Sequence, residues 1–443
     1  MIQFGYARED ITPARGIGLC GYFEPRPNKG MRDQLNLRAA IFSDGKTVSG
    51  IIEYDLCLLL RETIDSFRAA LKEAGMAFAD DLLFNCNHTH TGPYTADLWG
   101  DPDSDYVEEV KLKTVLAVKR AYASLADAEL FSGKTECSTL AFNRRFWMTD
   151  GTVLTNPGKL NPNIVKPEGG IDADIPYLVV RQDGFDRLII ANISNHTDTI
   201  GDDLVSADWT GRMERAIQNH YGYDIQVITL IGCQGNINHF NVKNNANQTC
   251  YAESVRIGNG YAAEIIASLY AIEPVKADFI KVDHGEIEVP AYKVTDKEYN
   301  EAKAILAEIG SLEAVDAKDM TSEGIASGSV FVKKFFAERL VENRDNPMTE
   351  KRVELLSALK FGDAVGIATF PGECFIEMGL AVKAASRFPM TMVATLCQGE
   401  VGYIGMPECY ERGGGYETRP QRTSVDHDVA PKIIAAEIEV LNR

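Results

Sequence analysis

The sequence lacks two features that membrane-bound and nucleic-acid-binding proteins need. It has no run of about 18 apolar residues, the length that crosses a lipid bilayer. It also has no excess of positive charge: the formal net charge is -19 at pH 7, which disfavours contact with phosphate backbones and anionic lipid surfaces. We therefore expect neither a membrane nor a nucleic acid among its partners.

Signals for secretion and for disulfide formation are also absent. The opening residues, MIQFGYAREDITP, contain neither a basic start nor a long apolar run with a cleavage site. The 9 cysteines are odd in number and include no CxxC pair, and Cys57 and Cys397 lie inside apolar runs. Reduced, buried thiols explain this distribution better than a disulfide framework, so we expect a cytoplasmic protein.

What the sequence does have is a repeated alternation of short apolar runs and amphipathic segments. The runs predict strands at residues 37–42, 48–60, 82–86, 177–180, 188–193, 225–231, 364–370 and 392–397. The amphipathic segments predict helices at residues 62–74, 106–125, 207–220, 252–271 and 374–385. Many runs are continuously apolar, as expected for strands covered on both faces. The pattern predicts an α/β or α+β fold, with a large mixed β-sheet flanked by helices.

The chain shows no obvious division into separate units. It contains no internal repeat, low-complexity tract or long linker, so we expect a single large domain over residues 1–443. Residues 296–359 differ in character because they are charged and rich in Ala, Glu and Lys. This segment predicts a helical insertion or a cap over the sheet, and a solvated helical hairpin is the interpretation we favour.

Five of the apolar runs end in polar side chains of kinds that bind ligands. These residues are Asn87, His88 and His90; Asn195 and His196; Gln234, Asn236, Asn238 and His239; Glu373; and Glu400 and Tyr403. In open α/β sheets, ligands bind on loops beyond the carboxyl ends of the strands. The five runs therefore predict one convergent polar site.

The first of these runs ends in the sequence HTHTGPY. Residues two apart in an extended segment point the same way, so His88 and His90 are predicted to face one site. Neutral imidazole is a common ligand of zinc. Both histidines could bind a metal, or one could bind it while the other transfers protons. The alternative is a pair of turn histidines bonded to backbone carbonyls.

Two more residues extend this candidate metal site. His196, in SNHTD, would bring another imidazole from a second strand, and its neighbour Asp198 could orient it through the second ring nitrogen. Glu373, after a Pro-Gly turn, would complete the His, His, Glu set found at catalytic zinc, although an acid there could simply stabilise a helix amino end. Because the chain has only 7 histidines, three at strand ends indicate a joint role.

With these residues in order, the chain resembles the catalytic domain of the neutral, non-lysosomal ceramidases and their short bacterial relatives. The similar segments are GYAREDITPARGIGLCGY, NHTHTGP, LVSADWTGR, GNINHF, FPGECF and GYIGMPECYERGGGYE. They occur in the family's order and spacing across most of the chain. The resemblance implies the ceramidase catalytic fold and the activity of an amide hydrolase.

The resemblance also implies roles for individual residues. Two His, one Glu and one Tyr hold zinc in that family, which implies one ion held by His88, His196, Glu373 and Tyr403. It places His90 beside the attacking water, and Arg144 near the scissile amide. It further implies that Tyr416 is a second active-site tyrosine. The family's active-site serine falls at Asn238, and we expect no counterpart of the family's carboxy-terminal immunoglobulin-like domain. These departures predict negligible hydrolysis of long-chain ceramide.

These observations support a hypothesis for the reaction. We expect a zinc-dependent hydrolase with a small-molecule substrate, cleaving an amide or an ester of a polar compound such as an acylated amino sugar by metal-activated water. His90 would accept the proton of the water and later pass it to the leaving group. Arg144 and Tyr416 would stabilise the developing oxyanion, and Asn238 would orient substrate or water. The alternatives are a lyase or isomerase that uses the same ion, and a non-catalytic sugar- or lipid-binding relative.

Overall fold

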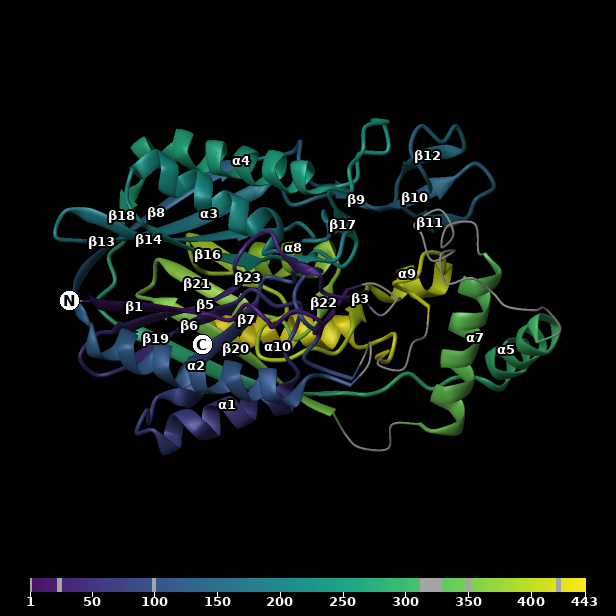
Figure 1. The fold of residues 1–443 in the computed structure, drawn as a ribbon, viewed down its shortest axis with the longest axis horizontal. Coiled ribbons are helices and arrows are strands. Elements are labelled where there is room, and N and C mark those ends of the chain that lie inside the picture. The colour runs from purple at the N-terminus through teal and green to yellow at the C-terminus, as the bar shows by residue number, and fades with distance from the viewer. Residues whose placement is uncertain (1, 22–25, 98–100, 311–328, 348–351, 420–423) are drawn as a thin grey trace.

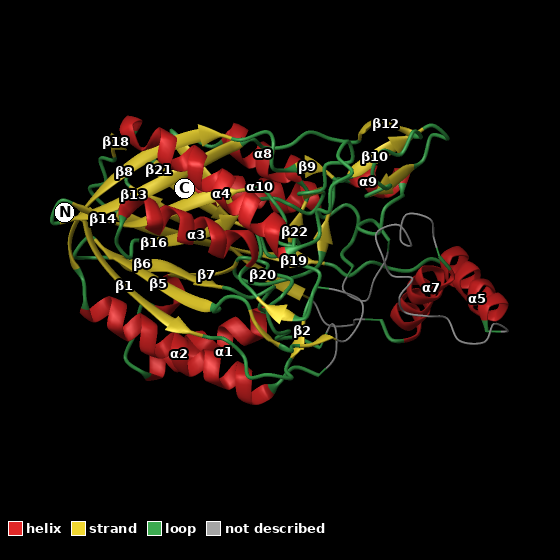
Figure 2. Ribbon diagram, turned by 45° about the horizontal axis from the view of Figure 1, so that its top comes forward, coloured by secondary structure: helices red, strands yellow, loops and turns green. Residues whose placement is uncertain are grey.

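Two β-sheets and the helices outside them make up most of the chain. The computed structural model describes residues 2–21, 26–97, 101–310, 329–347, 352–419 and 424–443. The two sheets have nine and four strands. They lie between helices (Figure 1 and Figure 2). The mixture of parallel and antiparallel pairs confirms the predicted fold class. Within the described ranges, no helix combines the length and apolar character needed to cross a bilayer.

The larger sheet is covered by two pairs of helices on its outer face. Its strands lie in the order β16 (Gln226–Ile231), β14 (Phe185–Ile193), β13 (Asp174–Gln182), β8 (Ala126–Glu136), β1 (Ile2–Asp10), β5 (Asn36–Ser43), β6 (Val48–Tyr54) and β7 (Leu82–Cys86), and β18 (Glu273–Pro274) pairs with β8. The helices are α1 (Arg61–Glu73), α2 (Ser104–Ala123), α3 (Asp208–Tyr221) and α4 (Tyr251–Ser268). Apolar side chains of α1 and α2 pack on β5, β6 and β7, and those of α3 and α4 pack on β13, β14 and β16.

The smaller sheet packs against the inner face of the larger one. Its order is β19 (Ile280–Val289), β20 (Arg352–Phe361), β21 (Val365–Thr369) and β23 (Met390–Ala394). Phe42 and Phe361 meet in the shared core at a ring-centroid distance of 5.0 Å. Helices α8 (Ile376–Ala385) and α10 (Ala430–Asn442) cover the outer face of this sheet. The layers are therefore helix, sheet, sheet and helix, and strands covered on both faces read as continuous apolar runs.

Short elements connect these layers. The strand pairs are β2 (Gly18–Leu19) with β3 (Arg26–Pro27), β4 (Gly30–Met31) with β15 (Leu204–Val205), β9 (Phe142–Asn143) with β17 (Ile237–Asn238), and β22 (Glu373–Cys374) with β24 (Tyr403–Ile404). A small sheet contains β11 (Val153–Thr155), β10 (Arg145–Met148) and β12 (Ile164–Pro167). The short helices are η1 (Ala79–Asp81), η2 (Leu269–Ala271) and α9 (Pro407–Arg412). Several of these elements carry predicted site residues.

Every strand and helix predicted from the sequence has a counterpart, but the run at 48–60 was predicted too long. Strand β6 ends at Tyr54, the last residue that pairs with β7. At the next position the Asp55 carboxylate accepts hydrogen bonds from the Asn36 N–H at 2.7 Å and from Arg38 at 2.9 Å. The Asp55 carboxylate thus takes the Asn36 N–H of strand β5, which a backbone carbonyl would accept if β6 continued.

The segment 296–359 is helical only in part. It contains α5 (Asp296–Ile309) and α7 (Val330–Asp345), which pack against each other and project away from the two sheets (Figure 1). Its final residues belong to β20, so the helical part was predicted too long at this end. Strand β20 pairs with β19 along its whole length and buries Leu356 and Ala358 in the core. Residues 311–328 and 348–351 of the segment lie outside the described residues.

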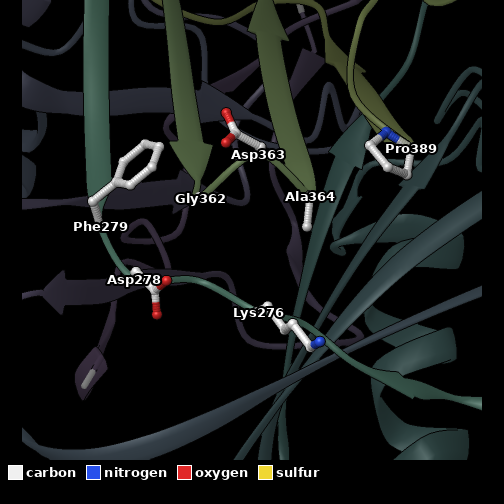
Figure 3. A pocket seen from close by; sticks show the side chains of 7 residues that line it. All are labelled: Lys276, Asp278, Phe279, Gly362, Asp363, Ala364 and Pro389. Carbon is white, nitrogen blue, oxygen red and sulfur yellow. The ribbon is translucent and has the colours of Figure 1, made fainter.

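A shallow pocket of about 320 Å³ lies at the edge of the smaller sheet where β21 begins (Figure 3). It is lined by Lys276, Asp278, Phe279, Gly362, Asp363, Ala364 and Pro389. None of the residues predicted to act in chemistry lines it. The predicted residues His88, His196 and Glu373 instead follow the carboxyl ends of β7, β14 and β21.

Candidate metal and catalytic site

The carboxyl ends of three strands bring His88, His196 and Glu373 together. His88 follows β7, His196 follows β14, and Glu373 lies in β22 just after β21. The Nε2 atom of His88 lies 3.2 Å from Nε2 of His196 and 3.2 Å from Oε2 of Glu373. The distance from His196 Nε2 to Glu373 Oε2 is 3.7 Å. Four ligands bound to zinc at about 2.0–2.1 Å in a tetrahedron lie about 3.3 Å apart, so this spacing fits one small cation.

His90 joins the cluster by a different backbone route from the one predicted. Its Nε2 atom lies 3.4 Å from Nε2 of His88, and the two rings meet edge to face. His88, however, is not in an extended segment: its φ is 64°, in the left-handed region that a residue with a Cβ rarely adopts. The His88 N–H donates to the Leu56 carbonyl at 2.9 Å, which helps to hold this conformation. Strained backbone of this kind is concentrated at functional sites.

Hydrogen bonds define which ring nitrogens face the cluster. The His88 Nδ1 atom lies 2.9 Å from the Cys57 carbonyl oxygen, which can only accept, so Nδ1 carries a proton and Nε2 is the ring nitrogen that faces the cluster. The prediction that Asp198 orients His196 through its second ring nitrogen was wrong. Among the described residues, His196 Nδ1 is buried without a hydrogen-bond partner, and Asp198 Oδ1 instead lies 3.0 Å from Nδ1 of His239.

The charges of the cluster suit a cation. Burial opposes ionisation of Glu373, but attraction to His88 outweighs it and lowers the pKa of Glu373 to about 2. Burial likewise disfavours a charged His88, yet Glu373 raises its pKa to about 9. Burial lowers the pKa of His90 to about 3 and holds the pKa of His196 well below its usual value. The cluster thus holds one carboxylate and at least two neutral imidazoles, the forms that bind metals.

Tyr403 lies directly beside Glu373, because β22 and β24 are parallel and these two residues are opposite each other in register. The Tyr403 ring meets the Tyr416 ring edge to face at a centroid distance of 5.7 Å. The Arg144 guanidinium lies 5.5 Å from the centroid of Tyr403 and 5.1 Å from that of Tyr416. The structure therefore brings together two tyrosines and an arginine next to the histidine cluster.

Arg144 is fixed in this position by buried partners. Its Nη2 atom donates to the Gly235 carbonyl at 2.6 Å, and its Nε atom lies 2.9 Å from Glu417 Oε1. Burial alone would lower the pKa of Arg144, but Tyr416, Tyr403 and Glu417 hold it well above the usual value. A permanent positive charge aimed at the site is the kind of group that stabilises a developing oxyanion.

Solved structures of two ceramidases share this architecture. The neutral ceramidase from Pseudomonas aeruginosa aligns over 100% of this chain and 75% of its own, with a TM-score of 0.74 and 17% sequence identity. A ceramidase complexed with C2 aligns over 99% of this chain and 74% of its own, with a TM-score of 0.72 and 16% identity.

This chain has the neutral ceramidase fold. The fold implied by the resemblance in the sequence is thereby confirmed. No protein-family model and no curated protein matches the sequence itself.

Asn238, at the position where the resemblance expects the ceramidase serine, is buried and engaged locally. Its Nδ2 atom donates to Asn156 Oδ1 at 3.1 Å, and its Oδ1 atom accepts from the Phe240 N–H at 3.1 Å. One N–H of the carboxamide is left after these bonds. Its part in orienting a substrate stays a prediction, because no contact with the histidine cluster is seen among the described residues.

Other polar residues at the strand ends brace the neutral ceramidase fold. Asn195 donates to the Leu140 carbonyl at 3.2 Å, Asn236 donates to Glu377 at 3.0 Å, and the Glu400 carboxylate accepts from the Gly402 N–H at 2.5 Å. The convergent site is therefore smaller than the five strand ends predicted. These side chains satisfy buried loop backbone and neighbouring side chains, which a run of polar letters does not distinguish from ligand binding.

Sequence reasoning missed Glu417. Its side chain is fully buried and lies between two guanidinium groups, 2.9 Å from Arg144 Nε and 3.1 Å from Arg145 Nη1. It also accepts from Thr155 Oγ1 at 2.5 Å. The only available signal was its position next to Tyr416, since the residues that it joins are far apart in the sequence.

Proposed function

We propose that this chain is a zinc-dependent hydrolase that cleaves an amide bond in a small polar molecule, with residues 1–443 acting as one catalytic domain. The observation that carries the proposal is the group of His88, His196 and Glu373, whose ligand atoms all lie within 4.8 Å of one another. The reaction class is supported by the two aligned structures, both of ceramidases. An ester is the less favoured substrate.

The donor set fits zinc. It contains two imidazole nitrogens and one carboxylate oxygen, with spacing close to that of a tetrahedral site, and the Tyr403 oxygen is the fourth ligand that we propose. Bound there, zinc would lower the pKa of a coordinated water to about 7 and polarise a substrate carbonyl. His88 already turns its Nε2 atom toward the cluster, because its other ring nitrogen bonds to a carbonyl.

The residues around the cluster supply the proton transfers and the charge. His90 lies beside the proposed ligands, with its Nε2 atom 3.4 Å from that of His88, and we propose that it accepts the proton of an attacking water and passes it to the leaving amine. Arg144 keeps its positive charge beside the site and stabilises the oxyanion. The Tyr416 phenol, whose pKa is raised by burial, remains protonated and donates a second hydrogen bond to the oxyanion.

The substrate we propose is polar, small and encountered inside the cell. Asn238 at the place of the ceramidase serine supports a substrate other than long-chain ceramide, because a carboxamide is not an effective nucleophile. Partly exposed Asp198 adds a carboxylate beside the cluster. All 9 cysteines are free thiols, and 8 of them are buried, which supports a reducing compartment such as the cytoplasm.

The test is hydrolysis of an amide panel that includes N-acetylglucosamine and a long-chain ceramide. The protein is stripped with a chelator, and activity is measured before and after zinc is returned, in water enriched in heavy oxygen. We expect zinc to restore release of an acid that carries one heavy oxygen, with ceramide left intact. Products without added water would instead identify a lyase or isomerase, and binding without turnover a non-catalytic relative.

A further inference from the structure

One short segment, residues 395–398, joins the two edges of the larger sheet. Strands β16 and β7 are these edges, and an edge strand carries backbone groups that its own sheet leaves unpaired. The segment follows β23 of the smaller sheet and forms hydrogen bonds with both β16 and β7. We call residues 395–398 the clasp.

At the β16 edge, the contacts come from Thr395. Its N–H donates to the Ile231 carbonyl at 2.8 Å, and its hydroxyl donates to the Gly232 carbonyl at 3.0 Å. Ile231 is opposite Ile193 in the parallel pairing of β16 with β14, and Ile193 lies just before His196. The clasp therefore begins beside the strand end that carries His196.

At the β7 edge, Gln398 takes the place of a missing neighbouring strand. Its Nε2 atom donates to the Leu82 carbonyl at 3.2 Å, and its Oε1 atom accepts from the Phe84 N–H at 3.4 Å. The backbone N–H of Gln398 also donates to the Phe84 carbonyl at 2.9 Å. One residue thus satisfies three backbone groups along the free edge of β7.

Leu396 connects the backbones that carry His88 and Glu373. Its carbonyl accepts from the Cys86 N–H at 3.1 Å, and its N–H donates to the Gly372 carbonyl at 3.4 Å. Cys86 is the last residue of β7, and Gly372 directly precedes Glu373. The clasp therefore ties the strand end before His88 to the turn before Glu373.

The backbone of the clasp is strained and needs support. The φ angles of Leu396 and Gln398 are 52° and 71°, in the left-handed region that a residue with a Cβ rarely adopts. Such a conformation persists where the surrounding structure holds it. Besides its bonds to β7, the fully buried Gln398 carboxamide accepts from Arg68 and donates to Ser357 Oγ at 3.1 Å. Both donor and both acceptor positions of the carboxamide are thus filled.

We propose that Gln398 is a positioning residue for the metal site: by closing the clasp, it holds the backbones before His88 and Glu373 at the spacing that one ion needs. The inference rests on the proposed zinc site. The carboxamide bonds to groups other than the proposed ligands, so its effect on zinc is indirect. Substitution of a ligand side chain leaves the clasp intact, whereas loss of the Gln398 side chain opens it.

Zinc affinity is the first measurement, made on the full-length protein by competition with a fluorescent chelator. Gln398→Ala should bind zinc about 10-fold more weakly than the parent, near the lower limit for residues that orient a metal ligand. The clasp would relax from its left-handed conformation and release the Cys86 and Gly372 bonds.

Gln182→Ala is the matched control. The Gln182 Nε2 atom also donates to carbonyls of the larger sheet, those of Phe4 at 2.9 Å and Ala126 at 3.0 Å, but at the end of the sheet where β14 begins. This variant should lower the unfolding midpoint and keep the zinc affinity of the parent. An equal loss of zinc affinity in Gln182→Ala and Gln398→Ala would reduce the role of Gln398 to general stability and overturn the proposal.

The histidine rings give a second measurement that needs no metal. The chain has 7 histidines, so isotope-labelled histidine gives a simple nuclear magnetic resonance spectrum, in which His88→Ala identifies the His88 signals. In metal-free Gln398→Ala, the His88 ring signals should shift, whereas those of the exposed His220 in α3 should stay in place. Gln182→Ala should leave both sets of signals unchanged.

The two measurements separate this inference from the proposed function. A parent that binds no zinc would overturn the proposed metal site, and the His88 signals of the metal-free protein would then decide the role of Gln398. Unchanged zinc affinity or unchanged His88 signals in Gln398→Ala would overturn that role and leave the zinc site standing. If Gln398→Ala does not fold, Gln398→Glu takes its place with the same expectations, because it keeps the acceptor for Arg68 and loses the donor to Leu82.

Discussion

The two halves of the candidate site are held in place in different ways. His88, His196 and Glu373 sit at the ends of strands, and backbone hydrogen bonds fix them: the His88 N–H donates to the Leu56 carbonyl at 2.9 Å, and the Glu373 N–H donates to the Gly402 carbonyl at 3.0 Å. The C-terminal segment, residues 403–417, has only the two-residue strand β24 and the short helix α9. Tyr403 shares the β22–β24 pair with Glu373, but Tyr416 depends on side-chain contacts instead.

A stack of three rings supports the C-terminal segment from outside. The His427 ring lies between Tyr410, at a centroid distance of 4.0 Å, and Tyr292, at 4.2 Å. The Tyr410 hydroxyl donates to the Tyr403 carbonyl at 3.3 Å, and the Tyr292 hydroxyl donates to Glu298 in α5 at 2.7 Å. The stack thus connects the helical hairpin to the backbone of Tyr403.

The comparison indicates in which half of the site a single substitution should displace neighbouring residues and in which half it should not. Strand ends are positioned by many backbone bonds, so a single change there should alter chemistry without moving the neighbouring residues. The C-terminal segment is positioned by a few side chains, so single changes at those side chains should shift the catalytic groups that they support.

The largest effect is expected at His90, in the strand-end half. His90→Ala removes the proposed base, so turnover should fall by about 10²–10⁴-fold, as measured by kcat/KM on an amide substrate. Metal content should stay unchanged, because His90 is not a ligand that we propose. His220→Ala, at an exposed histidine of α3, is the control. Loss of the metal together with activity would show that His90 is a ligand.

The next effect is expected in the C-terminal half, at Glu417. Glu417→Gln leaves the buried guanidinium groups of Arg144 and Arg145 without their shared carboxylate, and removing one partner of a buried ion pair costs about 3–5 kcal/mol of unfolding free energy. Chemical denaturation measures this loss. Turnover should fall as Arg144 moves, while zinc content is kept. Glu408→Gln, at an exposed position, should change neither quantity, and equal behaviour of the two variants would remove Glu417 from the account.

A smaller effect is expected at the ring stack. His427→Ala removes the central ring and loosens Tyr410 and the Tyr403 carbonyl, so zinc affinity should fall by about 10-fold, near the lower limit for residues that orient a metal ligand. Competition with a fluorescent chelator measures the affinity. Tyr292→Phe keeps the stack and should bind zinc like the parent. An unchanged affinity in His427→Ala would show that Tyr403 needs no support from the stack.

The smallest effect is expected on the pH dependence of stability, at Glu354. This residue lies in β20, away from the reacting groups. Burial raises the pKa of Glu354 from 4.5 to about 7. Between these values the folded protein keeps a proton that the unfolded chain has lost, so this group stabilises the fold at low pH and its contribution is lost as pH rises through about 7. Glu354→Gln should flatten the dependence of the unfolding midpoint on pH in this window. A slope equal to that of the parent would contradict the shift.

The sequence alone indicated His88, His196 and Glu373 in the strand-end half of the site. It indicated little about the C-terminal segment. An apolar run followed by a polar residue marks the end of a buried strand, which is why His88, His196 and Glu373 could be found. Tyr403 followed from the family resemblance, and its place beside Glu373 depends on a parallel pairing of two short strands. Glu417 offered no signal beyond its position next to Tyr416, because its partners Arg144 and Arg145 are distant in sequence.

Two details of the strand-end half were also beyond the sequence. The His88 and His90 rings meet through a left-handed residue, so the spacing rule for extended segments gave the right neighbours for the wrong reason. Asp198 was expected to orient its neighbour His196, but it pairs with His239 from another strand end. Strand β1 was not predicted because polar and charged residues interrupt its apolar positions, and most of β20 was included in the predicted helical segment 296–359.

The most direct test of the account is the metal content of the protein purified without added metal. Elemental analysis should find about one zinc ion per chain in the parent, and zinc should be lost in His88→Ala and in His196→Ala, each of which removes one proposed ligand. Circular dichroism should show that both variants keep the fold. Zinc contents equal to that of the parent in folded His88→Ala and His196→Ala would contradict the proposed metal site.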